Sequence, residues 1–157
     1  MKITVLAVGK LSEAHWRAAA AEYIKRMGGE LTVVELPEVS VPRGASAAEI
    51  QKAIEKESAA MLARLPRRAY VVGLFVEGKS CSSQALAQKL EQLPLRGFSE
   101  AAFLIGGSYG MSAAVKAACH ELLSFSPMTF PHQLMRVMLL EQLYRARSIA
   151  KGTDYHK

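Results

Sequence analysis

Residues 106–110, Gly-Gly-Ser-Tyr-Gly, contain the clearest candidate nucleophile of the chain. They match the pattern G-x-S-x-G, in which a serine on a sharp turn after a strand attacks an acyl carbon. Asp154 and His156 follow Ser108 in the order that α/β-hydrolases use. However, a catalytic triad normally draws on separate loops, whereas Asp154 and His156 lie two residues apart. A serine hydrolase using Ser108 is therefore an alternative and not the favoured interpretation.

Other ligand-binding motifs are incomplete. Glu77–Ser80 contains Gly-Lys-Ser but lacks the upstream glycine of a phosphate-binding P-loop. The first apolar run ends in a single glycine, Gly9, so the dinucleotide fingerprint G-x-G-x-x-G is missing. Cys81 and Cys119 have no C-x-x-C spacing, and the four histidines have no metal-ligand spacing. We expect no metal site and no disulfide framework.

The elements that must position these residues alternate along the chain. Apolar, β-branched runs predict strands at Ile3–Val8, Leu31–Leu36, Ala69–Val76, Ala101–Ile105 and, more weakly, Leu122–Ser124. Helices are predicted between them, at Ser12–Met27, Ser46–Arg64, Ser82–Leu93, Ser112–His120 and Pro131–Lys151. Ser46 and Glu49 have the spacing of a capping box. The alternation favours an α/β fold with one parallel sheet flanked by helices, in a single domain over residues 1–157.

The last predicted helix is apolar on nearly all sides. At 100° per residue its apolar side chains leave no purely polar face. They are Leu134, Met135, Val137, Met138, Leu139, Leu140, Leu143, Tyr144 and Ile149. One sheet covers only one side of a helix, so we expect a homodimer through this helix; burial in the monomer core is the alternative. Glu141 and Arg145 are four residues apart and should pair.

The charge of the chain favours a polyanionic partner. The net charge is +6 over 157 residues, although many small proteins are mildly basic for solubility. Basic residues cluster at Arg64, Arg67 and Arg68, and again at Lys25 and Arg26. The first apolar run is too short for a signal peptide, and no run is long enough to cross a membrane. We therefore expect a cytoplasmic protein that binds nucleic acid and no membrane.

A specific resemblance runs through the whole chain and is densest in its last third. Its motifs are Leu6–Lys10, Gly78–Lys79, Leu104–Gly110, Leu123–Arg136, Glu141–Ala146 and Tyr155–Lys157. Together they resemble the RlmH family of SPOUT-class methyltransferases, which methylate N3 of a pseudouridine in 23S ribosomal RNA. The sequence departs from the family pattern at Tyr109, where relatives carry Asn or Glu, and at Asp154, often Pro or Ala.

The resemblance implies a fold, a cofactor and a partner. The fold would be an α/β sheet with a C-terminal trefoil knot, the cofactor S-adenosylmethionine, and the partner 23S ribosomal RNA within the ribosome. Three loops would hold the cofactor: Leu74 after the third strand, Gly107 after the fourth, and a loop before the last helix. That loop comprises Ser126, Pro127, Met128, Thr129, Phe130 and Pro131. Glycine in such a loop lets the backbone approach a ligand closely, and the prolines stiffen it.

The same resemblance suggests catalytic residues. The N3–H of pseudouridine must lose its proton before it attacks a methyl group, so a base or a nearby positive group is needed. His156 is the first candidate base, with Tyr155 stacking on or orienting the substrate. Arg136 would stabilise developing negative charge, and His132 is a second candidate base. Alternatively, the tail only binds RNA phosphate, and the chain is a non-catalytic RNA-binding protein.

Overall fold

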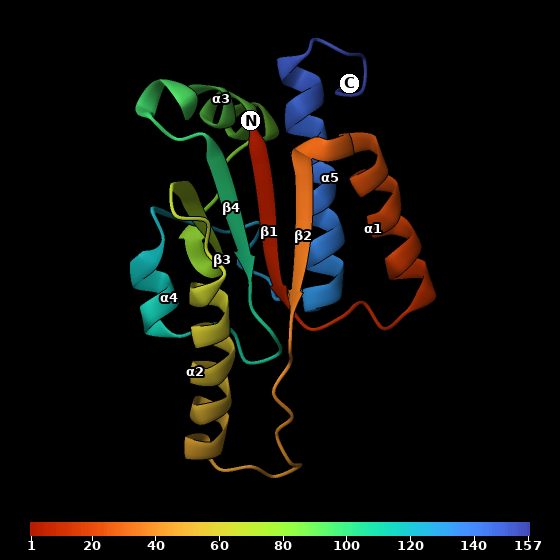
Figure 1. The fold of residues 1–157 in the computed structure, drawn as a ribbon. Helices are drawn as coiled ribbons and strands as arrows, with labels where there is room; N and C mark the ends of the chain where they lie inside the picture. The colour runs from red at the N-terminus through yellow and green to blue at the C-terminus, as the bar shows by residue number, and fades with distance from the viewer.

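A computed structural model describes residues 1–157 and shows one sheet of five parallel strands (Figure 1). The strands are β1 (Lys2–Val8), β2 (Leu31–Leu36), β3 (Ala69–Lys79), β4 (Glu100–Ile105) and β5 (Glu121–Leu123). Their order across the sheet is β2-β1-β4-β3-β5, and every neighbouring pair is parallel. The predicted parallel sheet is therefore confirmed, and all carboxyl ends meet at one edge.

Helices cover both faces of this sheet. They are α1 (Ala14–Met27), α2 (Ala47–Ala63), α3 (Ser83–Gln92), α4 (Ala113–Ala118) and α5 (His132–Ala150), with short 3-10 helices η1 (Gly28–Glu30) and η2 (Pro94–Arg96). Residues of α1, α3 and α5 share one apolar core with the sheet, and residues of α2 and α4 share the other. The predicted capping box of Ser46 and Glu49 is present, and Ser82 and Ser112 each cap a helix through their side chains.

The two central strands are buried on both faces. Val5 on β1 and Phe103 on β4 have no exposed area and belong to the larger core, under α1, α3 and α5. Leu6 and Leu104, the next residue on each strand, are equally buried in the smaller core, under α2. Successive side chains on a strand point to opposite faces, so these strands supply both cores at once.

Strand β3 bends around the end of β5. Leu123 is paired with both Leu74 and Lys79 of β3, and the Ser124 N–H donates to the Lys79 carbonyl at 3.0 Å. A Cβ atom on Gly78 would lie 2.7 Å from backbone atoms of Leu122 and Leu123, so only glycine fits at this crossing. The predicted end of this strand at Val76 was wrong: the strand continues to Lys79 because it pairs with β5.

Helix α5 lies against the sheet, between α1 and α3 (Figure 1). Leu139, Leu140 and Leu143 are fully buried, whereas Leu134 and Val137 stay half-buried. The predicted ion pair between Glu141 and Arg145 is present. No helix in the structure combines the length and apolarity needed to span a membrane.

Candidate functional site

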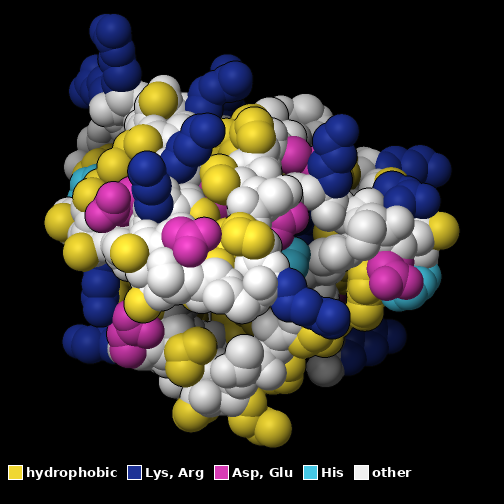
Figure 2. Space-filling model, turned by 90° about the horizontal axis from the view of Figure 1, so that it is seen from below, with side chains coloured by type: hydrophobic (Ala, Val, Ile, Leu, Met, Phe, Trp, Pro, Cys, Tyr) yellow, Lys and Arg dark blue, Asp and Glu magenta, His cyan; other side chains and the backbone are white.

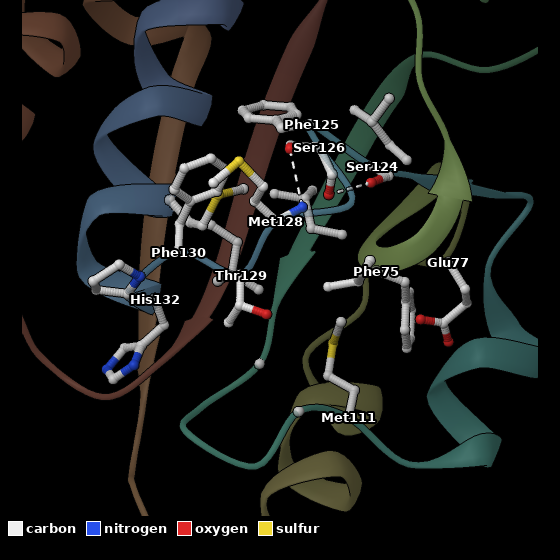
Figure 3. A pocket seen from close by; sticks show the side chains of 18 of the residues that line it. Phe75, Glu77, Met111, Ser124, Phe125, Ser126, Met128, Thr129, Phe130 and His132 are labelled. Carbon is white, nitrogen blue, oxygen red and sulfur yellow. Dashed lines mark hydrogen bonds between the residues drawn. The ribbon is translucent and has the colours of Figure 1, made fainter.

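A cavity of about 660 Å³ opens at the carboxyl edge of the sheet, beyond β3, β4 and β5 (Figure 3). Its walls come from three segments, residues 74–77, 105–111 and 123–135. Most of the residues predicted to hold a cofactor line it: Leu74, Gly107, Ser126, Met128, Thr129, Phe130 and Pro131. Pro127 lies in the third segment but does not line the cavity. Parallel strands that end at one edge thus bring all three predicted loops together.

The cavity combines apolar walls with loop hydroxyl groups. Ten of its 20 lining residues are hydrophobic, and Ser124, Ser126 and Thr129 add hydroxyls. Two hydrogen bonds shape the third segment, as Figure 3 shows: the Ser124 hydroxyl donates to the Ser126 carbonyl at 3.0 Å, and the Met128 N–H donates to the Ser126 hydroxyl at 3.0 Å. The loop is therefore held by its own side chains before any ligand binds.

Packing within the protein leaves little room for a side chain at either of the two glycines after β4. A Cβ atom on Gly107 would lie 3.1 Å from the Val8 side chain and 3.4 Å from the carboxylate of Glu57. A Cβ atom on Gly106 would lie 2.7 Å from the Met111 side chain. Close approach of a ligand to Gly107, expected from the sequence, stays a prediction, and the protein's own atoms limit the space at both glycines as well.

Glu57 is a buried carboxylate beneath the Gly107 loop that sequence reasoning missed. It is 5% exposed and accepts the Val39 N–H at 3.1 Å. Burial raises the pKa of Glu57, the nearby Glu38 raises it further, and His132 opposes the shift. The available signal was spacing: Glu57 lies four residues from the buried Ala53 and Met61, on the apolar stripe of α2.

His132 and Arg136 both lie near the start of α5 but face different surroundings. His132 lines the cavity, and Figure 3 shows its imidazole at the edge, turned away from Ser126 and Met128. Arg136 is 2% exposed and does not line the cavity. Its guanidinium donates to the Glu35 carboxylate at 2.6 Å and to the Gly9 carbonyl at 2.7 Å. Arg136 therefore ties α5 to the ends of β1 and β2.

Tyr155 and His156 pack at the opposite end of α5. The Tyr155 hydroxyl donates to Glu141 at 3.1 Å, and the Arg145 guanidinium lies 4.8 Å from the centre of the Tyr155 ring. Burial, with help from a hydrogen bond to Tyr23, raises the pKa of Tyr155 to about 12, so the phenol stays protonated. Tyr155 thus keeps its O–H donor at neutral pH.

The imidazole of His156 is held between two side chains. Its Nε2 lies 2.8 Å from the Gln84 amide and its Nδ1 lies 3.3 Å from the Arg145 guanidinium. A guanidinium only donates, so Nδ1 accepts and the ring proton is on Nε2. The Nε2–H then needs an acceptor. The Gln84 amide provides one if it is turned by 180°, so that its oxygen and not its nitrogen faces Nε2.

The candidate catalytic residues are therefore not brought together within one chain. Arg145, beside His156, follows His132 by 13 residues on α5. At 1.5 Å per residue this separation is about 20 Å. Ser108 lies on the cavity loop and His156 at the far end of the helix, so the predicted Ser-Asp-His triad is not formed. No group of three or more His, Cys, Asp or Glu side chains is arranged to hold a metal ion.

The predicted basic clusters lie at the edge of the sheet away from the cavity. Arg64, Arg67 and Arg68 are exposed between the end of α2 and the start of β3, at the amino edge. Lys25 and Arg26 are in the last turn of α1, which ends at the same edge, and Arg26 pairs with Glu22. Figure 2 shows the opposite, carboxyl face, where Lys and Arg side chains surround a mixed apolar and acidic centre.

Comparisons with known proteins agree with this geometry. A family model described as "predicted SPOUT methyltransferase" matches residues 1–156. The chain is 45% identical over 159 residues to ribosomal RNA large subunit methyltransferase H of Streptococcus thermophilus (strain CNRZ 1066), covering 100% of both chains.

Solved structures share the fold at low identity. A probable methylase family protein from Haemophilus influenzae Rd KW20 has a TM-score of 0.55 at 15% identity, over 99% of this chain and 70% of that one. A putative methyltransferase from Legionella pneumophila, in complex with bound cofactor SAM, has a TM-score of 0.52 at 13% identity, over 94% of this chain and 66% of that one. With a family model across nearly all its length and a full-length relative at 45% identity, this chain belongs to the SPOUT methyltransferase family.

Proposed function

We propose that the protein transfers a methyl group from S-adenosylmethionine to N3 of a pseudouridine in the RNA of the large ribosomal subunit. The observation that carries the proposal is the cavity at the ends of β3, β4 and β5, built from the three loops on which the resemblance relies. The name of the 45% identical relative supports a ribosomal RNA substrate. Residues 1–157 would act as one domain, in the cytoplasm where ribosomes are found.

The residues of the cavity fit the proposed cofactor. When bound, S-adenosylmethionine supplies a methyl group on a positively charged sulfur. Leu74, Ile105 and Phe130 give apolar walls for its adenosine, and Ser126 and Thr129 give hydroxyls for its polar groups. The volume of about 660 Å³ lies within the usual range of small-molecule sites, roughly 300–1,000 Å³. No metal is needed for this transfer.

The base that removes the N3 proton is proposed to be His156. Its Nδ1 faces the Arg145 guanidinium at 3.3 Å, so Arg145 would have to move aside before this nitrogen accepts the substrate proton. Tyr155 would orient the base of the RNA. His132 lines the cavity and is the second candidate. The Arg136 guanidinium already donates to the Glu35 carboxylate and the Gly9 carbonyl. Arg136 would therefore contribute to charge stabilisation only indirectly, by fixing the position of α5.

A homodimer would resolve the separation between the cavity, which His132 lines at the start of α5, and His156, which contacts Arg145 about 20 Å further along that helix. A groove of about 500 Å³ runs along the half-buried side of α5, lined by Tyr23, Leu86, Val137 and Met138 among others. A second copy of this helix suits it, because a two-fold axis lets the same apolar surface cover itself. With the two α5 helices antiparallel, the tail of one subunit lies beside the cavity of the other.

The first experiment uses S-adenosylmethionine labelled in its methyl group. The protein is incubated with ribosomes from a strain lacking this enzyme and, separately, with free ribosomal RNA. We expect label on one pseudouridine of large-subunit RNA, and a large loss of turnover in His156→Ala with unchanged cofactor affinity. No label on either substrate, together with no cofactor binding, would overturn the proposal. Labelling of Ser108 by a fluorophosphonate would then be tested.

The shared site has its own experiment. His156→Ala removes the proposed base, and Ser126→Trp fills the cavity. Each homodimer should be inactive. In a mixed dimer one site combines the intact cavity of the first variant with the intact tail of the second, so activity should return. Mixed dimers as inactive as their parents would show that each site is built from one chain.

A further inference from the structure

The large apolar side chains exposed on this protein are concentrated around the cavity. Five are more than one-third exposed: Met1, Val76, Leu95, Tyr109 and Met128. Three of them lie one on each loop that builds the cavity: Val76 is 53% exposed, Tyr109 52% and Met128 71%. Val76 and Met128 line the cavity, and Tyr109 lies between its lining residues Ser108 and Gly110, so each loop of the cavity carries one apolar side chain that faces solvent.

Tyr109 stands apart from the other four tyrosines because its ring contacts no aromatic or hydrogen-bonding partner. Tyr23, Tyr70, Tyr144 and Tyr155 each pack against another aromatic ring. Tyr109 has no aromatic contact, no cation above its ring and no hydrogen bond to its hydroxyl. Its exposure is therefore not offset by any interaction within the chain.

The backbone beneath Tyr109 is nevertheless fixed. The Gly110 N–H donates to the Gly107 carbonyl at 3.1 Å and closes a tight turn around residues 108 and 109. Gly110 has a φ of +85°, which favours glycine. The far end of the loop is held by the buried Ser58, whose hydroxyl accepts the Ser112 N–H at 3.0 Å. A rigid turn thus presents a free aromatic ring on one of the loops that build the cavity.

The position of this ring indicates what it binds. Tyr109 lies between Ser108 and Gly110, which line the cavity that the methyl acceptor must reach in the proposed reaction. A nucleobase taken out of its stack has two apolar faces that need cover, and aromatic side chains supply it regardless of base identity. Lys and Arg side chains surround the same face in Figure 2, which suits the phosphates on either side of that base.

We propose that Tyr109 is the stacking platform for the target nucleobase, with Val76 and Met128 completing an apolar rim around it. This inference rests on the proposed methyl transfer to RNA. Stacking on a nucleobase needs only the aromatic ring of Tyr109, and its hydroxyl has no hydrogen-bond partner within the chain. The groove along α5 remains the surface for a second subunit, and it shares neither Tyr109, Val76 nor Met128 with this rim.

The test compares Tyr109→Ala and Tyr109→Phe, with Leu95→Ala as the matched control. Leu95 is 88% exposed but lies in η2, at the amino edge of the sheet and far from the cavity. Loss of one stacked base should raise KM for the RNA substrate about 5- to 150-fold in Tyr109→Ala, with kcat nearly unchanged. Tyr109→Phe and Leu95→Ala should behave as wild type, and cofactor affinity should be equal in all four proteins.

Three results would overturn this inference. One is an unchanged KM in Tyr109→Ala while the wild type methylates its substrate. Another is a KM for the RNA substrate that rises as much in Tyr109→Phe as in Tyr109→Ala, since the hydroxyl and not the ring would then contact the substrate. The third is conversion of the dimer to a monomer by Tyr109→Ala, which would assign the rim to a second subunit. A wild type that methylates no RNA would instead refute the proposed function itself.

Discussion

The crossing of β3 over β5 gives the sharpest test of the structure, through the substitution Gly78→Ala. A Cβ atom at this position would lie 2.7 Å from the carbonyl carbon and oxygen of Leu122 and from the carbonyl carbon of Leu123. Non-bonded carbons pack at about 3.5–4.0 Å, so one of the two backbones must move by about 1 Å. Neither can do so freely, because Leu123 is paired to β3 on both sides of Gly78.

The expected loss of stability follows from these contacts. An extra methyl group in a packed site costs about 1–3 kcal/mol. Breaking the bond from the Ser124 N–H to the Lys79 carbonyl adds about 1 kcal/mol. The reduced backbone freedom of alanine in the unfolded chain returns about 0.5–1 kcal/mol. The net decrease in the free energy of unfolding should be about 1–3.5 kcal/mol.

Urea denaturation followed by circular dichroism measures this change. With an m-value of about 2 kcal/mol/M, the midpoint should fall by about 0.5–1.75 M urea. Gly29→Ala is the matched control, because nothing lies within 4 Å of a Cβ atom at Gly29 and its φ is not positive. If Gly78→Ala is no less stable than Gly29→Ala, the two backbones do not cross at this distance and our account of β3 is refuted.

Three further substitutions test the surroundings of the cavity. Burial raises the pKa of Glu57 above its ordinary value of 4.5, so Glu57 holds its proton more tightly in the folded protein than in the unfolded chain. The free energy of unfolding therefore falls as the pH rises through the range in which Glu57 loses this proton. Between pH 4 and 8, the urea midpoint of Glu57→Gln should therefore rise relative to the midpoint of the wild type. A difference between the two midpoints that does not change with pH would contradict this. Arg136→Met leaves the Gly9 carbonyl without its donor and should cost about 1–3 kcal/mol, or a melting temperature lower by about 3–10 °C; a shift under a degree would refute the anchoring role. Ser126→Ala removes an acceptor that shapes its loop and should weaken cofactor binding about 2- to 10-fold by calorimetry, whereas Ser99→Ala, at an exposed position directly before β4, should not; equal effects would count against the loop hydrogen bond.

Local signals made most of the fold predictable from sequence. The capping box of Ser46 and Glu49 sets the start of α2, and Gly9 ends the first strand, because both act within a few residues of the chain. The end of β3 was not predictable in this way. Lys79 is part of the strand because of Leu123, 44 residues further along, and no local pattern encodes that pairing.

The site was predictable to the extent that it follows from the sheet. Loops after neighbouring parallel strands must meet at one edge, so the three cavity segments could be placed together. The position of His156 depends instead on its contacts with Gln84 and Arg145, from another helix and an earlier turn of α5. Glu57 was hidden for a different reason: a single carboxylate on an apolar stripe resembles an ordinary surface residue until the loop above it is known.

The bend of β3 around β5 also has a consequence for how the chain is made. The residues of β2, β1, β4 and β3 have all been synthesised once Ile105 has been added, but β5, the third wall of the cavity and α5 all follow. At 5–20 residues per second the last 52 residues take about 3–10 s to emerge. During that interval the sheet face that α5 covers is open to water and to other nascent chains. The unfinished protein is therefore vulnerable to aggregation until α5 has been added, and no ligand of the unfinished cavity can protect it.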